Sequence, residues 1–418
     1  MSRCVARWVA LAAWLTSFLA AAIWSVRAAV ADGWARMDTE AGLLNAIEWC
    51  PGRADYQLQL AFLLVEKDPA RSEAALRRAV ALNPNETRAW IALGLRHEAR
   101  NEFAAAERCL IHAAERDKQY APRWSLANYY YRRKDLNQFW RWAVSAAQVV
   151  AGDPKPLFRL CVRLAPAENL VERLAIKNAQ VRAQYLLYLF EENQAGQVVP
   201  VAARVLESNR AVDLQLVQSA CGWLLEKGRA EDALTVWNRL AARGAVPFEE
   251  LDPARGRSLT NGDFAVAPNS RGFDWRLTGT AGISASMEES PPGLRLTLSR
   301  SQPENCEVLV QYLAVLERTN YEIRFVYRTS GIPSKGGLQW RVTDLRGGNN
   351  LLQRMAGDGT TAGAEIASAE NETQGEFAFA TPAGCRFARL ALIYERVRGS
   401  TRIAGDVILR RVELVRKN

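Results

Sequence analysis

Side chains that commonly perform catalysis are few or scattered in this sequence of 418 residues. The two histidines, His97 and His112, are too few for a histidine-rich metal centre and leave little room for a Ser-His-Asp triad. No G-x-S-x-G, H-E-x-x-H or G-x-x-x-x-G-K-S/T motif occurs. Asp and Glu are plentiful, so counting alone leaves a pair of catalytic carboxylates open. From these patterns we predict no catalytic residue and no metal ligand.

The cysteines do not suggest a metal or redox site. Seven are present, and no two of them form a C-x-x-C pair, so zinc binding and thioredoxin-type chemistry are unsupported. Cys306 and Cys385 fall in the same predicted domain and could form a disulfide if the chain is exported. The alternative is that both are buried free thiols.

The basic residues of the chain are not clustered. There are 54 Lys and Arg residues against 45 Asp and Glu residues, which gives a net charge of +9. Nucleic-acid-binding proteins usually concentrate such charge on one face or tail, whereas here it is spread along the sequence. With 49% hydrophobic and 24% charged residues, the chain has the composition of a folded protein. These counts argue against a nucleic-acid partner, whole-chain disorder and a multi-span membrane protein.

The N-terminal segment, residues 1–31, is predicted to insert into a membrane. Residues 8–26 carry no charge, and a helix of that length spans about 28 Å, close to the hydrocarbon core of a bilayer. Arg3 and Arg7 precede the span, which by the positive-inside rule keeps the N-terminus in the cytoplasm and exports the remainder. The span is either an uncleaved signal anchor in the inner membrane, with the bulk of the chain periplasmic, or a signal peptide. In the second case, cleavage at the A-x-A pattern of residues 29–31 would release a secreted protein.

A period of 34 residues characterises the next region. Residues that recur at this spacing are Tyr56, Trp90 and Trp124, and Ala79, Ala113 and Ala147. Leu93 and Gly94 follow Trp90 closely. This pattern resembles the tetratricopeptide repeat, in which each unit is a helical hairpin and the units stack because one hairpin cannot bury its apolar face. The resemblance implies an α-solenoid over residues 32–250, with five or six hairpins expected.

Tetratricopeptide arrays generally bind peptides or protein segments in a groove lined by the first helix of each hairpin, and the resemblance implies such a groove here. Counted from the Trp positions, the groove would carry Arg88, Ile91, Leu95, Glu98, Ser125, Tyr129, Arg132 and Arg133. Basic and aromatic side chains together suit a protein partner that is acidic or extended. The alternative is a solvated charged face without a partner.

The last third of the chain changes to a period of two. Residues 251–258 interrupt the helical pattern with Pro and Gly and are predicted to be a linker. Beyond it, one face of a strand carries Tyr321, Ile323, Phe325 and Tyr327. About eight or nine such short strands are expected within residues 259–418, which predicts an antiparallel β-sandwich. The predicted fold class is therefore a multidomain α plus β protein with a transmembrane helix, an α-solenoid and a β-sandwich.

The sandwich region opens with a distinctive set of residues. They are Asn261, Gly262, Asp263 and Phe264, followed by Gly272, Phe273 and Trp275. This opening resembles that of jelly-roll carbohydrate-binding modules with a galactose-binding-like fold. The resemblance implies that exposed aromatic rings could stack on sugar, and the candidate glycan contacts are Trp275, Tyr312 and Trp340.

The same resemblance bears on metal binding. Such modules often hold a structural calcium, for which Asp263 and Asp406 could supply oxygen ligands. The sequence has Arg410 and Arg411 where the family often has two Asp residues, so we expect no calcium and no other cofactor.

These patterns together predict a non-enzymatic scaffold of a bacterial envelope. The solenoid is expected to hold a protein partner, and the sandwich is expected to contact polysaccharide or another envelope component. By analogy, the setting would be the export or assembly of cell-surface polysaccharide. The competing hypothesis is an accessory enzyme module that acts on glycans.

Overall fold

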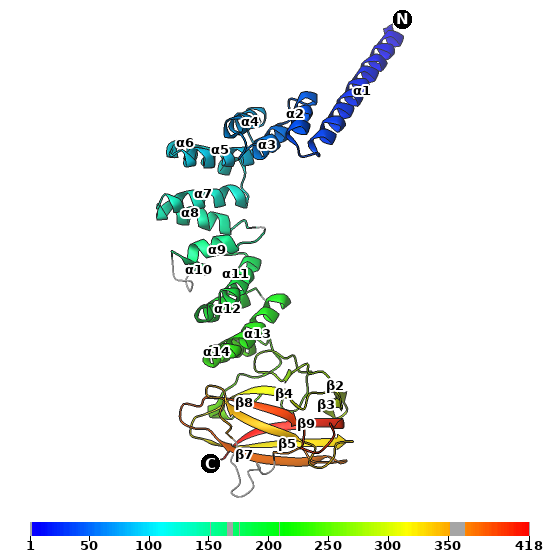
Figure 1. Cartoon of the computed structure of the whole chain (residues 1–418), viewed down its shortest axis with the longest axis vertical. Coiled ribbons are helices and arrows are strands. Elements are labelled where there is room, and N and C mark those ends of the chain that lie inside the picture. Colours follow the sequence, from blue (N-terminus) through cyan, green and yellow to red (C-terminus); the bar gives the residue numbers. More distant parts are fainter. Residues whose placement is uncertain are drawn as a thin grey trace. The chain divides into compact units, whose positions relative to one another are not determined.

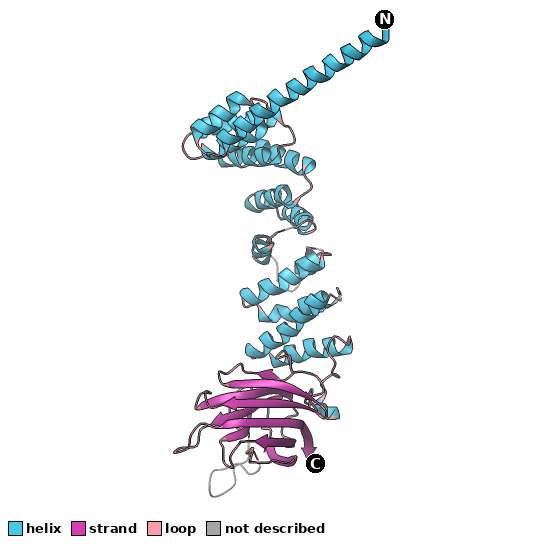
Figure 2. Ribbon diagram, turned by 90° about the vertical axis from the view of Figure 1, so that its right-hand side faces the viewer, coloured by secondary structure: helices cyan, strands magenta, loops and turns pink. Residues whose placement is uncertain are grey.

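The computed structural model describes residues 2–150, 152–164, 170–174, 176–208, 210–351 and 364–417. The chain divides into two compact units, Met1–Val181 and Arg182–Asn418. The first unit is helical, and the second combines helices with two β-sheets (Figure 1). Figure 2 shows the same division of helices and strands along the chain. The predicted fold class is thereby confirmed, because helices that include one long apolar helix precede two antiparallel sheets.

The first unit is built from helical hairpins. Its helices are α1 (Ser2–Ala35), α2 (Glu40–Trp49), α3 (Ala54–Leu63), α4 (Pro69–Leu82), α5 (Thr87–Ala99), α6 (Phe103–Arg116), α7 (Tyr120–Arg132), α8 (Leu136–Ala147), α9 (Lys155–Val162) and α10 (Leu170–Arg173). Neighbours in sequence pack in pairs: α1 with α2, α3 with α4, α5 with α6, and α7 with α8. The helices α3, α5 and α7 begin 33 residues apart, close to the period predicted from the sequence.

Local sequence signals explain where these helices begin and how they pair. The side chains of Asp68 and Asp135 accept hydrogen bonds from backbone N–H groups in the first turns of α4 and α8, as N-capping residues do. Gly94 in α5 has no side chain, and a Cβ there would lie 2.8 Å from Cγ of Leu110 in α6. The glycine of the repeat motif therefore permits the close approach of the two helices.

The core of the first unit begins inside α1. Ala31 and Ala35 are buried together with Leu43 of α2 and Tyr56 of α3. By contrast, every α1 side chain from Ala13 to Arg27 that the structure describes is exposed. One continuous helix thus carries an exposed apolar part and a part that belongs to the solenoid core.

The second unit begins with helices and ends in a sandwich. Its helices are α11 (Ala179–Glu191, which begins in the first unit), the short 3₁₀ helix η2 (Ala195–Gln197), α12 (Val198–Leu206), α13 (Ala211–Glu226), α14 (Ala230–Ala242) and the 3₁₀ helix η3 (Pro253–Arg255). Its strands are β1 (Arg276–Leu277), β2 (Ile283–Glu289), β3 (Pro292–Ser299), β4 (Asn305–Ala314), β5 (Asn320–Ser330), β6 (Leu338–Asp344), β7 (Thr373–Ala380), β8 (Phe387–Glu395) and β9 (Ala404–Lys417).

The strands form two antiparallel sheets that enclose one apolar core. The sheet orders are β1-β4-β8-β6 and β2-β3-β9-β5-β7. The alternating residues of β5 that were predicted to share a face, from Tyr321 to Tyr327, are all buried in this core. The period of two therefore identified both the strand and the face that it buries.

The last helical hairpin packs directly on the sandwich. Trp237 of α14 is fully buried, and its ring centroid lies 6.0 Å from that of Phe273 and 6.1 Å from that of Phe248. The backbone of Gly272 lies directly against the indole ring of Trp237. A Cβ at this position would lie only 2.5 Å from Cε3 of that ring. The glycine and phenylalanine of the predicted sandwich opening thus serve to join the two parts.

The segment predicted as a linker is packed. Leu251 is buried, and its backbone exchanges two hydrogen bonds of 2.9 Å with the side-chain amide of Asn238 in α14. Asp252 and Arg257 pair through their backbones and close a turn around η3. At the other end of the segment, the backbone oxygen of Ser258 accepts a hydrogen bond of 3.2 Å from Ala314 N–H in β4. Residues 251–258 therefore fix the hairpin to the sandwich, because they are bonded to both.

Substitution of Gly272 tests the importance of this contact. Gly272→Ala places a methyl group into the ring of Trp237 at a residue with φ of 54°, and we expect the free energy of unfolding to fall by about 2–4 kcal/mol. Gly279→Ala is the matched control, because Gly279 has φ of 65° but no atom within 4 Å of the new Cβ, and should cost only about 1–2 kcal/mol. Denaturant unfolding of the two variants measures the difference, and equal losses would contradict the steric argument.

Candidate functional site

The predicted groove residues of α5 lie on one face of that helix. Arg88 and Leu95 are exposed, and Ile91 and Glu98 are half-buried. The guanidinium carbon of Arg88 lies 5.3 Å from the ring centroid of Phe62, in the preceding first helix α3. A cation over an aromatic face is a stabilising arrangement, and it holds Arg88 against α3.

The predicted groove residues of α7 are less accessible. Tyr129 is buried, and its hydroxyl donates a hydrogen bond of 3.0 Å to the backbone oxygen of Phe103, so its prediction as a groove contact was wrong. It is buried because the hairpin of α5 and α6 packs against that side of α7. Ser125 bonds within its own helix, to Ala121. Arg133 places its guanidinium carbon 3.7 Å from the ring centroid of Phe103.

Arg132 also has a partner. It binds Glu98 through two hydrogen bonds of 2.7 Å each, in the bidentate geometry that suits guanidinium and carboxylate groups. The two residues belong to consecutive repeats and lie 34 residues apart, the period predicted from the sequence. One of the two arginines predicted for this part of the groove is therefore neutralised by the protein itself.

The structure adds one residue to the predicted set. Phe62 is the ninth residue of α3, as Leu95 is the ninth residue of α5, and their exposed fractions are 41% and 45%. Counting from the start of each helix, rather than from the Trp positions, would have found it. We call Phe62, Arg88, Ile91 and Leu95 the first-helix stripe.

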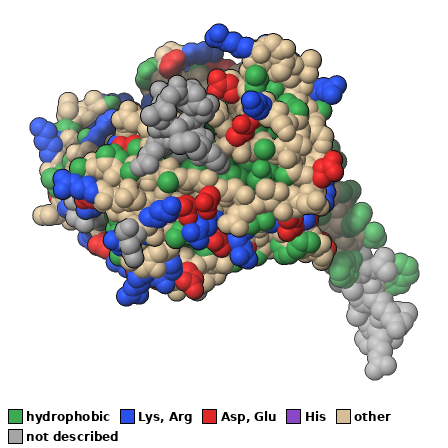
Figure 3. Space-filling model, turned by 90° about the horizontal axis from the view of Figure 1, so that it is seen from below, with side chains coloured by type: hydrophobic (Ala, Val, Ile, Leu, Met, Phe, Trp, Pro, Cys, Tyr) green, Lys and Arg blue, Asp and Glu red, His purple; other side chains and the backbone are tan. Residues whose placement is uncertain are grey.

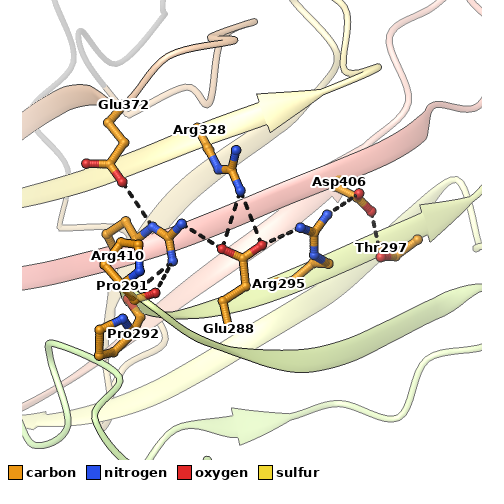
Figure 4. Close-up of polar contacts among 9 residues, drawn as sticks. All are labelled: Glu288, Pro291, Pro292, Arg295, Thr297, Arg328, Glu372, Asp406 and Arg410. Atoms are coloured by element: carbon orange, nitrogen blue, oxygen red, sulfur yellow. Dashed lines mark hydrogen bonds and ion pairs between the residues drawn. The ribbon is translucent and has the colours of Figure 1, made fainter.

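A second candidate lies on the five-stranded sheet, where charged side chains from four strands meet (Figure 4). Glu288 of β2 binds Arg410 of β9 at 2.6 Å and Arg328 of β5 at 3.3 Å, and it also pairs with Arg295 of β3. Arg295 in turn binds Asp406 at 2.6 Å. One carboxylate thus holds three guanidinium groups, and we call these five residues the Glu288 cluster.

The charges of this cluster set the ionisation of its central carboxylate. Partial burial raises the pKa of Glu288, but the nearby charges of Arg410 and Arg295 lower it by more, so the pKa lies below its ordinary value. Glu288 is therefore held ionised. A carboxylate of this kind is a poor general acid, because a general acid must carry a proton at working pH.

Two hollows border the cluster. One of about 600 Å³ is lined by residues that include Glu288, Arg328, Glu372 and Arg410, and one of about 510 Å³ by residues that include Arg295 and Asp406. Neither has an aromatic side chain among its lining residues. On the face seen in Figure 3, basic and acidic side chains are interspersed, in keeping with the diffuse charge of the sequence.

The predicted glycan contacts do not form an exposed platform. Trp275 and Trp340 are fully buried in the sandwich core, with ring centroids 6.2 Å apart, so their prediction as sugar contacts was wrong. The alternation of each strand turns these residues inward, where large apolar surface is best buried. Tyr312 is half-buried, and the guanidinium carbon of Arg276 lies 5.0 Å from its ring centroid.

The residues proposed for calcium do not fit that ion. Asp406 accepts hydrogen bonds from Arg295 and from the hydroxyl of Thr297, each at 2.6 Å. Asp263 is exposed and accepts a hydrogen bond from the backbone of Ala265. Within the described residues, no group of three or more His, Cys, Asp or Glu side chains is arranged to hold a metal.

The thiols of the sandwich are free. Cys306 lies near the backbone oxygen of Pro303, and the thiol of Cys385 donates to that of Phe387 at 3.6 Å, so the two cysteines do not form a disulfide. Burial raises the pKa of Cys385 to about 11. A thiol with such a raised pKa is a weak nucleophile because little of it is thiolate at neutral pH.

Comparisons with known proteins return both kinds of protein that the sequence resembles. No protein-family model and no curated protein matches the chain. A CBM4 structure is similar at 10% identity over 38% of this chain and 100% of that chain, with a TM-score of 0.29. PilF of Pseudomonas aeruginosa is similar at 15% identity over 53% and 91% of the two chains, with a TM-score of 0.26. YrrB, a TPR protein with an unusual peptide-binding site, is similar at 16% identity over 49% and 93%, with a TM-score of 0.23.

The role of Glu288 can be tested by its pH dependence. Because its pKa is lowered in the folded chain, its ionised form stabilises the fold above the ordinary value of 4.5, and this stabilisation is lost as the pH falls through the lower folded-state pKa. We expect Glu288→Gln to lower the free energy of unfolding by about 1–3 kcal/mol at neutral pH and by little in acid. Unfolding measured across this pH range checks the trend.

The adjacent Glu289 supplies the control, since it is exposed and has no ion pair among the described contacts. Glu289→Gln should change the free energy of unfolding by less than about 0.5 kcal/mol. A loss in Glu288→Gln that is the same at neutral and acid pH would refute the proposed charge interaction.

Proposed function

We propose that the chain is a non-enzymatic scaffold, anchored in a membrane by α1, that holds a protein partner on the first-helix stripe. The observation that carries this proposal is the pair of exposed apolar side chains, Phe62 and Leu95, at matching positions of consecutive first helices. Exposed apolar side chains that recur on one helix of successive repeats are suited to contact with a protein partner.

The stripe also favours one kind of partner. Arg88 lies over Phe62 and has no carboxylate partner among the described ion pairs, so it can bind an acidic group. Arg132 is already paired with Glu98. A fitting partner is therefore an extended segment that places an apolar side chain against Leu95 and a carboxylate near Arg88.

Two observations weigh against the competing proposal of a glycan-active module. The hollows of the five-stranded sheet have no aromatic residue in their linings, and the carboxylate at their border is held ionised by arginines. The first weakens the stacking of a sugar in these hollows, and the second weakens a general acid at their border. A setting in polysaccharide export or assembly stays a prediction from the sequence resemblance.

Leu95 provides the test of the stripe. A photoreactive residue at this position, in the full chain in native membranes, would identify the partner, and Leu95→Asp should then weaken its binding about tenfold or more. Titration of the purified partner measures the change. Leu136→Asp in α8 is the matched control, because Leu136 is 47% exposed against 45% for Leu95, and it should alter affinity less than about twofold. Equal effects of the two variants would contradict the assignment.

The structure favours an uncleaved anchor over a signal peptide. Cleavage after Ala31 would cut α1 within its helix and remove a fully buried residue of the solenoid core. It would also remove Arg27, which donates hydrogen bonds to the backbone oxygen of Trp49. By length and composition, α1 is the one helix among the described residues that could cross a membrane. Arg3 and Arg7 support export of the remainder.

The mass of the mature protein tests this choice. We expect the chain purified from membranes to retain residues 1–31, because they include part of the folded core. Intact-mass measurement shows this directly. Ala29→Arg, at an exposed position, destroys the A-x-A pattern and serves as an uncleaved reference with which the parent chain should co-migrate. A mature N-terminus at Asp32 would overturn the anchor.

A further inference from the structure

The change from exposed to buried side chains in α1 falls at one residue. Residues 8–26 of the helix carry no charge, those from Ala13 to Val26 are exposed, and Arg27 is the first charged residue after the span. The stripe of α1 that faces the solenoid begins with Ala28, which is half-buried, and continues with Ala31 and Ala35. If α1 spans a bilayer, as the proposed function holds, Arg27 marks the level at which the hydrocarbon core ends.

Arg27 holds the end of a second helix, α2, at this depth of the membrane. Its Nη2 and Nε donate hydrogen bonds of 2.8 and 3.3 Å to the backbone oxygen of Trp49, the last residue of α2. A cation at the C-terminus of a helix satisfies carbonyl groups that have no partner within the helix. Near the other end of the pair, Gly42 packs against the backbone of Trp34, so α2 runs antiparallel to α1 and ends beside Arg27.

The end of α2 carries a side chain suited to a bilayer surface. Trp49 is 42% exposed, although it is a large apolar residue. Tryptophan is enriched at the headgroup level of membranes because its ring is apolar and its N–H is polar. Leu44, also exposed, lies five residues earlier in α2, roughly 7.5 Å further along the helix axis, which is about the thickness of one headgroup layer.

Charge does not attract the end of α2 to the membrane. Arg53, in the turn after α2, pairs with Asp55 at 3.0 Å and approaches Asp32 at 3.8 Å, and Glu48 is exposed beside Trp49. The basic and acidic groups near the end of α2 thus offset one another. Any contact with lipid here rests on the tryptophan ring and not on anionic headgroups.

We propose that Trp49 and the turn of residues 50–53 lie in the headgroup layer of the membrane that α1 spans. The inference rests on the proposed anchoring by α1 and deepens it. The bilayer then contacts the first hairpin at two places, the helix α1 and the end of α2. Two contacts fix the tilt of the first unit, and with it the direction in which the first-helix stripe faces.

Lipid photolabelling tests the proposal in the full chain reconstituted into phosphatidylcholine vesicles. Single p-benzoylphenylalanine residues replace Phe18 in the span, Trp49 at the end of α2, or Leu136 in α8. The substitution at Trp49 keeps the backbone oxygen that Arg27 binds, and the replaced side chain is not part of the core. We expect lipid adducts at Phe18 and Trp49, and a yield at Leu136 at least tenfold lower, although Leu136 and Trp49 are similarly exposed.

Each of the other labelling patterns contradicts either the docking of α2 or the anchoring by α1. Adducts at Phe18 without adducts at Trp49 would overturn the docking and leave the anchor intact. A lack of adducts at Phe18 would overturn the anchor itself. In vesicles that contain phosphatidylglycerol, the yield at Trp49 should stay within about twofold, and labelling that requires this anionic lipid would overturn docking through the tryptophan ring.

Discussion

The packing of Gly272 and Phe273 against Trp237 is the contact on which the second unit depends. The indole of Trp237 is a large apolar surface at the end of the helical array, and it would be costly to leave in water. A residue without a side chain lets the backbone pass directly over the ring, and the ring of Phe273 packs against the indole at a tilt of 59°. The helical hairpin and the sandwich are consequently one body, so a force or tilt applied to α14 is carried to the sheets.

Buried apolar contacts also fix the helix at the N-terminal end of the chain. The apolar helix α1 continues into the solenoid core without a break, since Ala31 and Ala35 pack against α2 and α3. An anchor joined to a domain by a free linker would leave that domain unoriented, whereas a continuous helix does not. Packing of this kind limits rotation within each unit, of α1 against the helices that follow it and of α14 against the sandwich.

Much of the fold could be predicted because it follows from short repeating patterns. The spacing of Trp90 and Trp124 gave the helical hairpins, and the alternation around Phe325 gave a buried strand face. The candidate sites could be predicted only in part. Tyr129 was assigned to a binding surface from its place in the repeat and Trp275 from its residue type. Aromatic side chains are useful in cores as well as in sites, however, and burial was decided by neighbours distant in sequence.

The sequence by itself determined the order of the parts: an apolar helix, a period of 34 and a period of two, each of which expresses how a helix or strand must bury its own apolar face. Only the tertiary structure decided which polar groups meet. Arg295 and Asp406 are 111 residues apart, and Glu98 finds Arg132 in the next repeat. The first pair leaves no periodic trace, and the second, although it lies at the repeat spacing, cannot be told from two unpaired charges, because a single charged residue fits many surface positions. The contact that makes it a partner exists only once the chain has folded.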